Sequence, residues 1–205
     1  MKTLFISIDS KNKPDYNKFV KEINNIPYEN IALCYSNQFI EVANKIEKKI
    51  NKNILNKFQV LGCSNPQFNK KVEAILIIGQ GDFHAVSLAY ESKLPVYVLE
   101  GEKIRKVSNK EIEKLSKKEK GAMLKYLNSD NIGILVTNKP GQERLKRAIE
   151  FKNSLKSKKG YLFMSNDINI AEFENFVGID FWVNTACPRM DLSDAPIINL
   201  EKLNF

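Results

Sequence analysis

The chain alternates short apolar runs with longer stretches in which apolar positions recur every three or four residues. The run Ala74–Ile78 (AILII) is continuously apolar, as is typical of a parallel strand that is covered on both faces. Runs of this β-rich kind predict strands at Thr3–Ile8, Ile31–Tyr35, Glu73–Ile78, Pro95–Leu99, Ile132–Thr137, Tyr161–Met164 and Asp180–Asn184. The amphipathic stretches predict helices at Tyr16–Ile23, Asn37–Ile50, Phe83–Ser92, Asn109–Leu127, Gln142–Leu155 and Ile170–Phe176. Strands that alternate with helices indicate βαβ units and parallel sheets.

A change of composition divides the chain. Residues 101–130 are rich in lysine and glutamate, poor in β-formers and free of proline, which predicts a long exposed helix and no strand. We therefore expect an α/β protein with two small three-layer αβα lobes, mainly parallel sheets and a long joining helix. The first lobe, residues 1–105, would hold four strands. The second, residues 106–205, would hold the connecting helix and three strands.

Length and composition limit the class of protein. The chain has 205 residues, 43% of them hydrophobic and 27% charged, which is ordinary globular usage. No apolar run approaches the roughly 18 residues of a membrane helix. The N-terminus turns polar at Asp9, too early for a signal peptide. We expect a cytoplasmic protein without a membrane partner.

The charge balance is basic, with a net charge of +8. Only four of the cationic residues are arginines and 28 are lysines, which spread over helix faces as a solvated surface. The sequence shows no arginine-rich block and no basic stretch with interleaved aromatics. We therefore expect no direct contact with nucleic acid.

Three cysteines, Cys34, Cys63 and Cys187, occur in a chain without an export signal, so disulfides are not expected. Cys34 lies inside an apolar strand, where a thiol acts as a small hydrophobic side chain. Cys63 and Cys187 follow predicted strand ends beside glycine or proline, where a thiolate can face solvent or a metal. Their spacing fits no zinc motif, so it leaves a structural role and a metal-binding role both open.

Two further segments follow predicted strands. Gly79–His84 (GQGDFH) begins like a nucleotide fingerprint, but His84 stands where the third glycine belongs. This pattern fits either a tight strand-to-helix turn or a ligand site. His84 is the only histidine, so it is expected to be structural or to contact a ligand. Lys139–Gln142 (KPGQ) is a turn that lacks the ending of a phosphate-binding loop.

Four segments together resemble the diphthamide-synthase family, the 2-(3-amino-3-carboxypropyl)histidine synthases. Val60–Cys63 (VLGC) and Asn184–Arg189 (NTACPR) resemble the second and third cluster-cysteine motifs of that family. Gly79–His84 resembles its glycine-rich segment, and Thr137–Gln142 (TNKPGQ) resembles a loop of its last domain. The order and spacing match over nearly the whole chain.

The resemblance implies a noncanonical radical S-adenosylmethionine enzyme. Members of the family hold a 4Fe-4S cluster with three cysteines, one from each of three similar αβ domains. The fourth iron takes the amino and carboxylate groups of S-adenosylmethionine. Cleavage of the Cγ–S bond yields a 3-amino-3-carboxypropyl radical, which adds to a histidine of translation elongation factor 2 in the first step of diphthamide biosynthesis.

The resemblance also assigns expected roles, though no catalytic residue. Cys63 and Cys187 are the expected cluster ligands. Arg189 is expected either to hold the substrate carboxylate or to pair with Asp191 or Asp194. The residues expected to shape the S-adenosylmethionine pocket are Gly79, Gly81, Phe83 and His84. Those expected to face the same cavity from the second lobe are Lys139, Gly141 and Gln142.

The family's first cluster-cysteine motif has no counterpart in these 205 residues, and Cys34 does not align with a family ligand. Three interpretations follow. In the one we expect, the enzyme is split, and a separate chain supplies the N-terminal domain and the third cysteine. In the second, the chain is a noncatalytic subunit that supports an active partner. In the third, the two lobes serve an unrelated metal or ligand.

Overall fold

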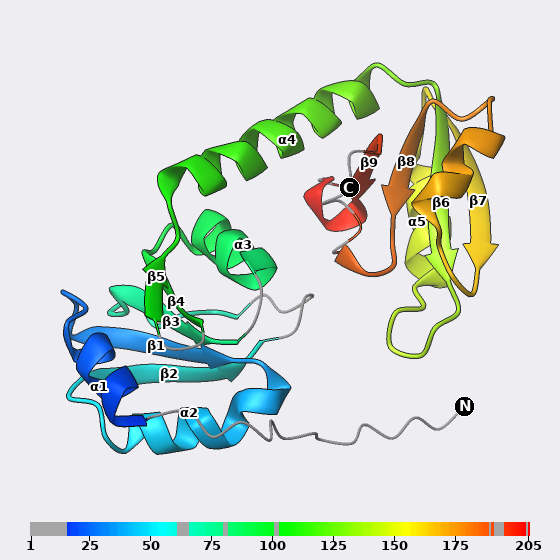
Figure 1. Ribbon diagram of the computed structural model, residues 1–205. Helices are drawn as coiled ribbons and strands as arrows, with labels where there is room; N and C mark the ends of the chain where they lie inside the picture. The colour runs from blue at the N-terminus through cyan, green and yellow to red at the C-terminus, as the bar shows by residue number, and fades with distance from the viewer. Residues whose placement is uncertain are drawn as a thin grey trace. The chain divides into compact units, whose positions relative to one another are not determined.

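The computed structural model describes residues 16–60, 66–79, 82–100, 103–188, 190, 195–203 and 205 (Figure 1). The chain divides into two compact units between Ser116 and Lys117, inside helix α4 (Asn109–Leu127). We call them the N-terminal and the C-terminal unit. Both interleave helices with strands in parallel-dominated sheets, which confirms the predicted α/β class.

The N-terminal unit is built on a five-stranded sheet in the order β2-β1-β3-β4-β5. Its parallel strands are β1 (Asn30–Tyr35), β2 (Asn53–Gln59), β3 (Ala74–Ile78) and β4 (Val96–Glu100). The short strand β5 (Lys103–Lys106) runs antiparallel to β4. The predicted strand Thr3–Ile8 lies outside the described residues.

Helices cover both faces of this sheet (Figure 1). On one face lie α1 (Tyr16–Asn24), the turn η1 (Asn37–Phe39) and α2 (Ile40–Glu47), and the buried Phe19 and Ile46 pack there against Leu33. On the other face α3 (Asp82–Ser92) and the start of α4 pack against the alternate side chains of the same strands. The unit therefore has the predicted three layers.

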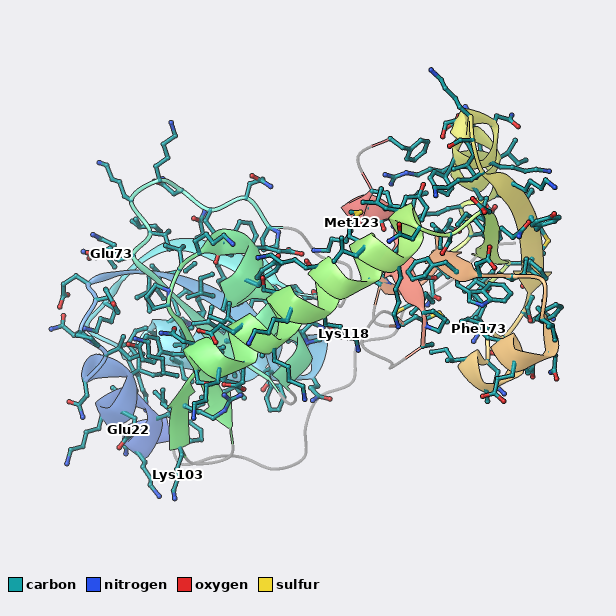
Figure 2. The ribbon with its side chains drawn as sticks, turned by 90° about the horizontal axis from the view of Figure 1, so that it is seen from above. Glu22, Glu73, Lys103, Lys118, Met123 and Phe173 are labelled. Carbon is teal, nitrogen blue, oxygen red and sulfur yellow. The ribbon has the colours of Figure 1, made fainter. Side chains whose placement is uncertain are left out.

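The C-terminal unit holds a four-stranded parallel sheet in the order β7-β6-β8-β9. The strands are β6 (Asn131–Thr137), β7 (Lys159–Ser165), β8 (Phe181–Asn184) and β9 (Ile197–Asn199). Helix α5 (Leu145–Ser154), the last part of α4 and the turn η4 (Leu200–Lys202) pack on one face, where Phe151 and Phe181 are buried. The 3-10 turn η2 (Ile170–Asn175) packs on the other. Figure 2 labels Met123 of α4 and Phe173 of η2, one from each face.

Gly133 on β6 makes room for Trp182 on the neighbouring strand β8. A Cβ atom at position 133 would lie 2.4 Å from Cε3 of Trp182, closer than nonbonded carbons approach. The indole ring stacks on Phe173, with centroids 4.4 Å apart and planes 22° apart. Glycine at this position is therefore a packing requirement, because the aromatic cluster occupies the space of a side chain.

Helix α4 begins with a reciprocal cap. The backbone N–H and the hydroxyl of Ser108 donate to a Glu111 carboxylate oxygen over 2.8 and 2.6 Å, and the Glu111 N–H donates back to Ser108 Oγ over 3.3 Å. This is a capping box. The hydrogen bonds from Ser108, together with Arg105, lower the pKa of Glu111 below its ordinary value. The cap fixes the start of the helix where its prediction placed it.

Several predicted elements are confirmed to within a few residues, and others are wrong. Strand β5 lies within residues 101–130, where no strand was expected. It pairs on one side with β4 and its residues are mostly polar, so no apolar run marks it in the sequence. Strands β2 and β9 were missed as well. The helix predicted at Ile170–Phe176 is a 3-10 turn over Ile170–Asn175, and the helix predicted from Gln142 starts at Leu145. Among the described helices, none combines the length and apolar character that crossing a bilayer requires.

Candidate functional site

Each sheet has one place where the chain changes direction along the strand order. From β1 the chain passes through α2 to β2, towards one edge of the sheet. From β3 it passes through α3 to β4, towards the other edge, and α3 lies on the opposite face of the sheet from α2. In the C-terminal unit the corresponding strands are β6 and β8. Loops that diverge in this way leave a crevice at the carboxyl ends of the two strands, which is where open α/β sheets bind ligands. We take these two strand ends as the candidate sites.

Buried polar residues gather at this edge of the C-terminal sheet. The buried polar side chains of the described residues are Ser129, Thr137, Asn184, Thr185 and Asn199. All but Ser129 lie at the carboxyl ends of β6, β8 and β9, with exposed fractions of 1–3%. Burying a polar group is costly unless it is hydrogen-bonded, so this grouping indicates a structured polar network.

The network holds the loop that carries Cys187. Asn184 Nδ2 donates to the Cys187 carbonyl over 2.8 Å and to Asn199 Oδ1 over 2.6 Å, and Asn184 Oδ1 accepts from Ala186 N–H over 2.9 Å. Asn199 Nδ2 donates to the Pro188 carbonyl over 2.7 Å. Cys187 itself is a free, half-buried cysteine. The main chain on both sides of this thiol is thus fixed by buried amides.

Thr185 attaches the same loop to the neighbouring strand. Its N–H and its hydroxyl both donate to the carbonyl of Leu135 on β6, over 3.1 and 2.7 Å. The ends of β6 and β8 are therefore connected beyond the last ladder pair, Leu135 with Asn184.

The loop after β6 carries three predicted pocket residues, Lys139, Gly141 and Gln142. The Thr137 hydroxyl accepts from Lys139 N–H over 3.2 Å, and Gln142 N–H donates to the Lys139 carbonyl over 3.0 Å. Gly141 has φ +79°, a left-handed conformation that favours glycine. The Lys139 ammonium forms an ion pair with Asp167, which follows β7. Lys139 is thus held by an acidic partner at the carboxyl edge of the sheet.

In the N-terminal unit, Gly79 is buried directly after β3, beside Ser36 at the end of β1. Phe83 and His84 lie in the first turn of α3, and the His84 side chain is half-buried. Cys63, Gly81 and Arg189 lie outside the described residues, as does the side chain of Phe83. Cys63 belongs to the connection between β2 and β3.

Cys34 has a core position and no site chemistry. Its side chain is fully buried in β1, and this burial raises the pKa of the thiol to about 12. A thiol that stays protonated is neither a nucleophile nor a metal ligand. The sequence-based interpretation of Cys34 as a small hydrophobic side chain is confirmed.

Within the residues that the structure describes, no group of three or more histidine, cysteine or acidic side chains could hold a metal ion. Sequence reasoning also missed Ser36 and Asn199. The signal for both was present, because each is a polar residue at the end of a β-rich run. Without strand order, a polar residue at such a place reads only as the start of a loop.

The chain is similar to proteins of known family. The family model described as "Putative diphthamide synthesis protein" matches residues 1–199. The 2-(3-amino-3-carboxypropyl)histidine synthase of Pyrococcus horikoshii is 31% identical over 138 residues, which cover 66% of this chain and 40% of that protein. The protein of the same name from Methanocaldococcus jannaschii is 28% identical over 200 residues, covering 95% of this chain and 57% of the relative.

Solved structures show the same fold. The crystal structure of Dph2 from Pyrococcus horikoshii matches with a TM-score of 0.76 and 22% identity, covering 91% of this chain and 60% of that chain. A second structure, of the same protein with a 4Fe-4S cluster, also matches with a TM-score of 0.76, at 23% identity. The chain spans about half the length of the curated relatives it matches. With a family model matched from residue 1 to residue 199, the chain belongs to the diphthamide synthesis family.

Proposed function

We propose that the chain is part of an enzyme that transfers a 3-amino-3-carboxypropyl group from S-adenosylmethionine to a histidine of translation elongation factor 2, in the first step of diphthamide biosynthesis. The support is the family match over residues 1–199 and the synthase names of the relatives. We assign the activity to an assembly that contains these residues together with the family's N-terminal domain.

The residues present fit one part of an iron–sulfur site. Cysteine thiolates are the usual ligands of 4Fe-4S clusters. Cys187 is half-buried, and its loop is fixed by Asn184 and Asn199, as suits a ligand that must be held in place. Cys34 does not fit, because its thiol is fully buried and keeps its proton. We propose Cys187 and Cys63 as two thiolate ligands of a 4Fe-4S cluster and the third thiolate as a contribution of the family's N-terminal domain.

When bound, such a cluster supplies the one electron that cleaves the Cγ–S bond of S-adenosylmethionine. The chain's own residues would bind and orient that substrate. The residues we propose for this pocket are Gly79, Gly81, Phe83, His84, Lys139, Gly141, Gln142 and Arg189. Of these, Lys139 is already engaged by Asp167, so we expect it to act on the substrate only if that ion pair opens.

The observation that carries the proposal is the position of Cys187. It follows β8 within three residues, at one of the two strand ends from which the chain continues towards opposite edges of the sheet. The polar groups of a surface loop can be hydrogen-bonded by solvent alone. This loop is instead fixed by the buried amides of Asn184 and Asn199. This arrangement favours a bound group at Cys187.

The test is anaerobic reconstitution with iron and sulfide. The chain is combined with a candidate partner that carries the family's N-terminal domain, and we expect a brown complex. Under reducing conditions the complex should cleave S-adenosylmethionine and label elongation factor 2. Cys187→Ala should remove the colour and the cleavage. Cys34→Ala is the matched control. It should keep both the colour and the cleavage, because the Cys34 thiol is buried in the core and is not a proposed cluster ligand.

Two results would replace the proposal. If Cys63→Ala and Cys187→Ala leave the activity of the assembly unchanged, the chain is a noncatalytic subunit that supports an active partner. If the isolated chain instead binds a stoichiometric metal ion that both variants lose, without cleavage in any assembly, the two units serve an unrelated metal.

A further inference from the structure

Ser36 and Gly79 lie side by side at the carboxyl edge of the N-terminal sheet. The last residues of β1 and β3, Tyr35 and Ile78, are partners in the parallel ladder. Ser36 and Gly79 are the next residues of the two strands, and Ser36 N–H donates to the Ile78 carbonyl over 3.1 Å. Both residues therefore stand at the carboxyl ends of the two strands between which the chain changes direction.

The Ser36 hydroxyl differs from the other buried polar side chains of the described residues. Its oxygen is buried, and among the described residues it is the buried side-chain polar atom that lacks a hydrogen bond. The main chain of Ser36 is satisfied, because its carbonyl also accepts from Phe39 N–H over 2.9 Å. A buried hydroxyl without a partner costs stability, so such a group in a native protein needs an explanation.

Gly79 keeps the neighbourhood of this hydroxyl clear. A Cβ atom at position 79 would lie 3.2 Å from Ser36 Oγ and 3.7 Å from Ser36 Cβ. The first distance is tighter than ordinary contact, so a side chain at this position would press on the hydroxyl. Glycine also permits a close approach of the backbone to a ligand.

The strand order makes the ends of β1 and β3 the switch point of this sheet. Helix α2, which follows Ser36, packs on the face of the sheet that carries Leu33 and Leu76. Helix α3, which follows Gly79, packs on the opposite face with Ile75 and Ile77. The two connections leave the strand ends in opposite directions, as they do in other doubly wound sheets of the order 2-1-3-4, which bind their ligands at this point.

We infer that the carboxyl ends of β1 and β3 form a ligand subsite in which the Ser36 hydroxyl hydrogen-bonds a polar atom of a bound small molecule and Gly79 admits it. Because a hydroxyl both donates and accepts, its partner can be a hydroxyl, an amine, a carbonyl or a ring nitrogen of the ligand. The identification of the ligand as S-adenosylmethionine rests on the proposed function. The subsite itself rests on Ser36 and Gly79.

Two measurements on Ser36→Ala test the inference, with Ser92→Ala as the matched control. Ser92 Oγ, in the same unit, donates to the Leu88 carbonyl over 2.5 Å and is satisfied. In the full chain without ligand, Ser36→Ala should raise the melting temperature, since it removes an unpaired buried hydroxyl. Ser92→Ala should lower it, because a hydrogen bond is lost.

The second measurement is the affinity for S-adenosylmethionine, determined by equilibrium dialysis on the reconstituted assembly. Ser36→Ala should weaken binding about 3- to 10-fold, the worth of one hydrogen bond. Gly79→Ala should weaken it further, and Ser92→Ala should leave it unchanged.

The inference is overturned if Ser36→Ala binds S-adenosylmethionine like the wild type. It is also overturned if Ser36→Ala lowers the melting temperature as Ser92→Ala does, because the hydroxyl then has an internal partner. If the wild-type assembly itself fails to bind S-adenosylmethionine, the proposed function fails and so does this identification of the ligand. The melting temperatures still decide in that case whether the Ser36 hydroxyl is unpaired.

Discussion

Asn184 and Asn199 share a buried hydrogen bond of 2.6 Å that joins the ends of the neighbouring strands β8 and β9. Each amide also holds a carbonyl of the loop between them, Asn184 that of Cys187 and Asn199 that of Pro188. The loop that carries Cys187, the proposed cluster ligand, is thus attached to the last residues of β8 and β9. Because both amides are buried, neither can exchange its partner for water without a cost in free energy.

Asn199→Ala tests this attachment. The substitution leaves the Pro188 carbonyl and part of the Asn184 amide without partners, so we expect the free energy of unfolding to fall by about 1–3 kcal/mol. The loop should also open more often, and Cys187 should react faster with a disulfide reagent in a Cys63→Ala background. Asn128→Ala, which removes an exposed amide that bonds to Leu124, should change neither quantity by much. An unchanged rate at Cys187 would show that the amides do not control this loop.

Gly133→Ala and Gly121→Ala should have opposite effects on stability. At position 133 a methyl group would meet the Trp182 ring at 2.4 Å, so we expect a loss of about 1–3 kcal/mol or more in urea denaturation. At position 121, inside α4, a Cβ would meet nothing within 4 Å. Alanine there should stabilise the helix by about 0.5–1 kcal/mol. Equal effects of the two substitutions would contradict the packing that we describe.

The Cys34 thiol should make stability depend on alkaline pH. Burial raises its pKa from 9.0 to about 12, so the folded state binds this proton more tightly than the unfolded state. The thiol therefore costs no stability below pH 9, and the folded state loses stability as the pH rises from about 9 towards 12. Comparison of wild type and Cys34→Ala in denaturant titrations isolates this contribution, because the other groups are shared. The variant should lose less stability over that range.

The capping box of α4 should make stability depend on acidic pH. The pKa of Glu111 is lowered by its hydrogen bonds from Ser108 and by Arg105, so its carboxylate contributes stability above pH 4.5, the ordinary value for glutamate. That contribution is lost as the pH falls through the lowered pKa of the folded state. Ser108→Ala should cost about 0.5–2 kcal/mol at neutral pH. A Glu111→Gln variant whose stability falls with acid as steeply as that of the wild type would rule out this role.

The apolar runs predicted the central strands well because those strands are buried on both faces. Ala74–Ile78 and Ile132–Thr137 have near-continuous apolar sequences, and both strands lie in the middle of their sheets. Strand β2 was missed because it lies at the edge of its sheet, where Asn53, Asn56 and Lys57 are tolerated and interrupt the pattern. Edge strands carry a weaker signal, since solvent replaces one of the neighbours that would demand an apolar side chain.

The candidate site was predictable by residue type and not by arrangement. Its motifs placed Cys187, Gly79 and Lys139 after strands, and the structure has all three at carboxyl ends of strands. The ion pair of Lys139 with Asp167 could not be predicted from the sequence, because the parallel pairing of β6 with β7 brings these residues together. The Ser36 hydroxyl, which has no hydrogen-bond partner in the described part of the chain, could not be predicted either, because its surroundings and not its residue type define this property.

The sequence by itself determined the α/β class, the resemblance to the diphthamide-synthase family and the core role of Cys34, because apolar periodicity and motif spacing are local properties of the chain. Only the tertiary structure decided the strand orders β2-β1-β3-β4-β5 and β7-β6-β8-β9. Strand order depends on which apolar runs pair across long separations in the sequence, and apolar periodicity does not show which runs pair. It is this order that brings Ser36 beside Gly79 and ties Asn184 to Asn199.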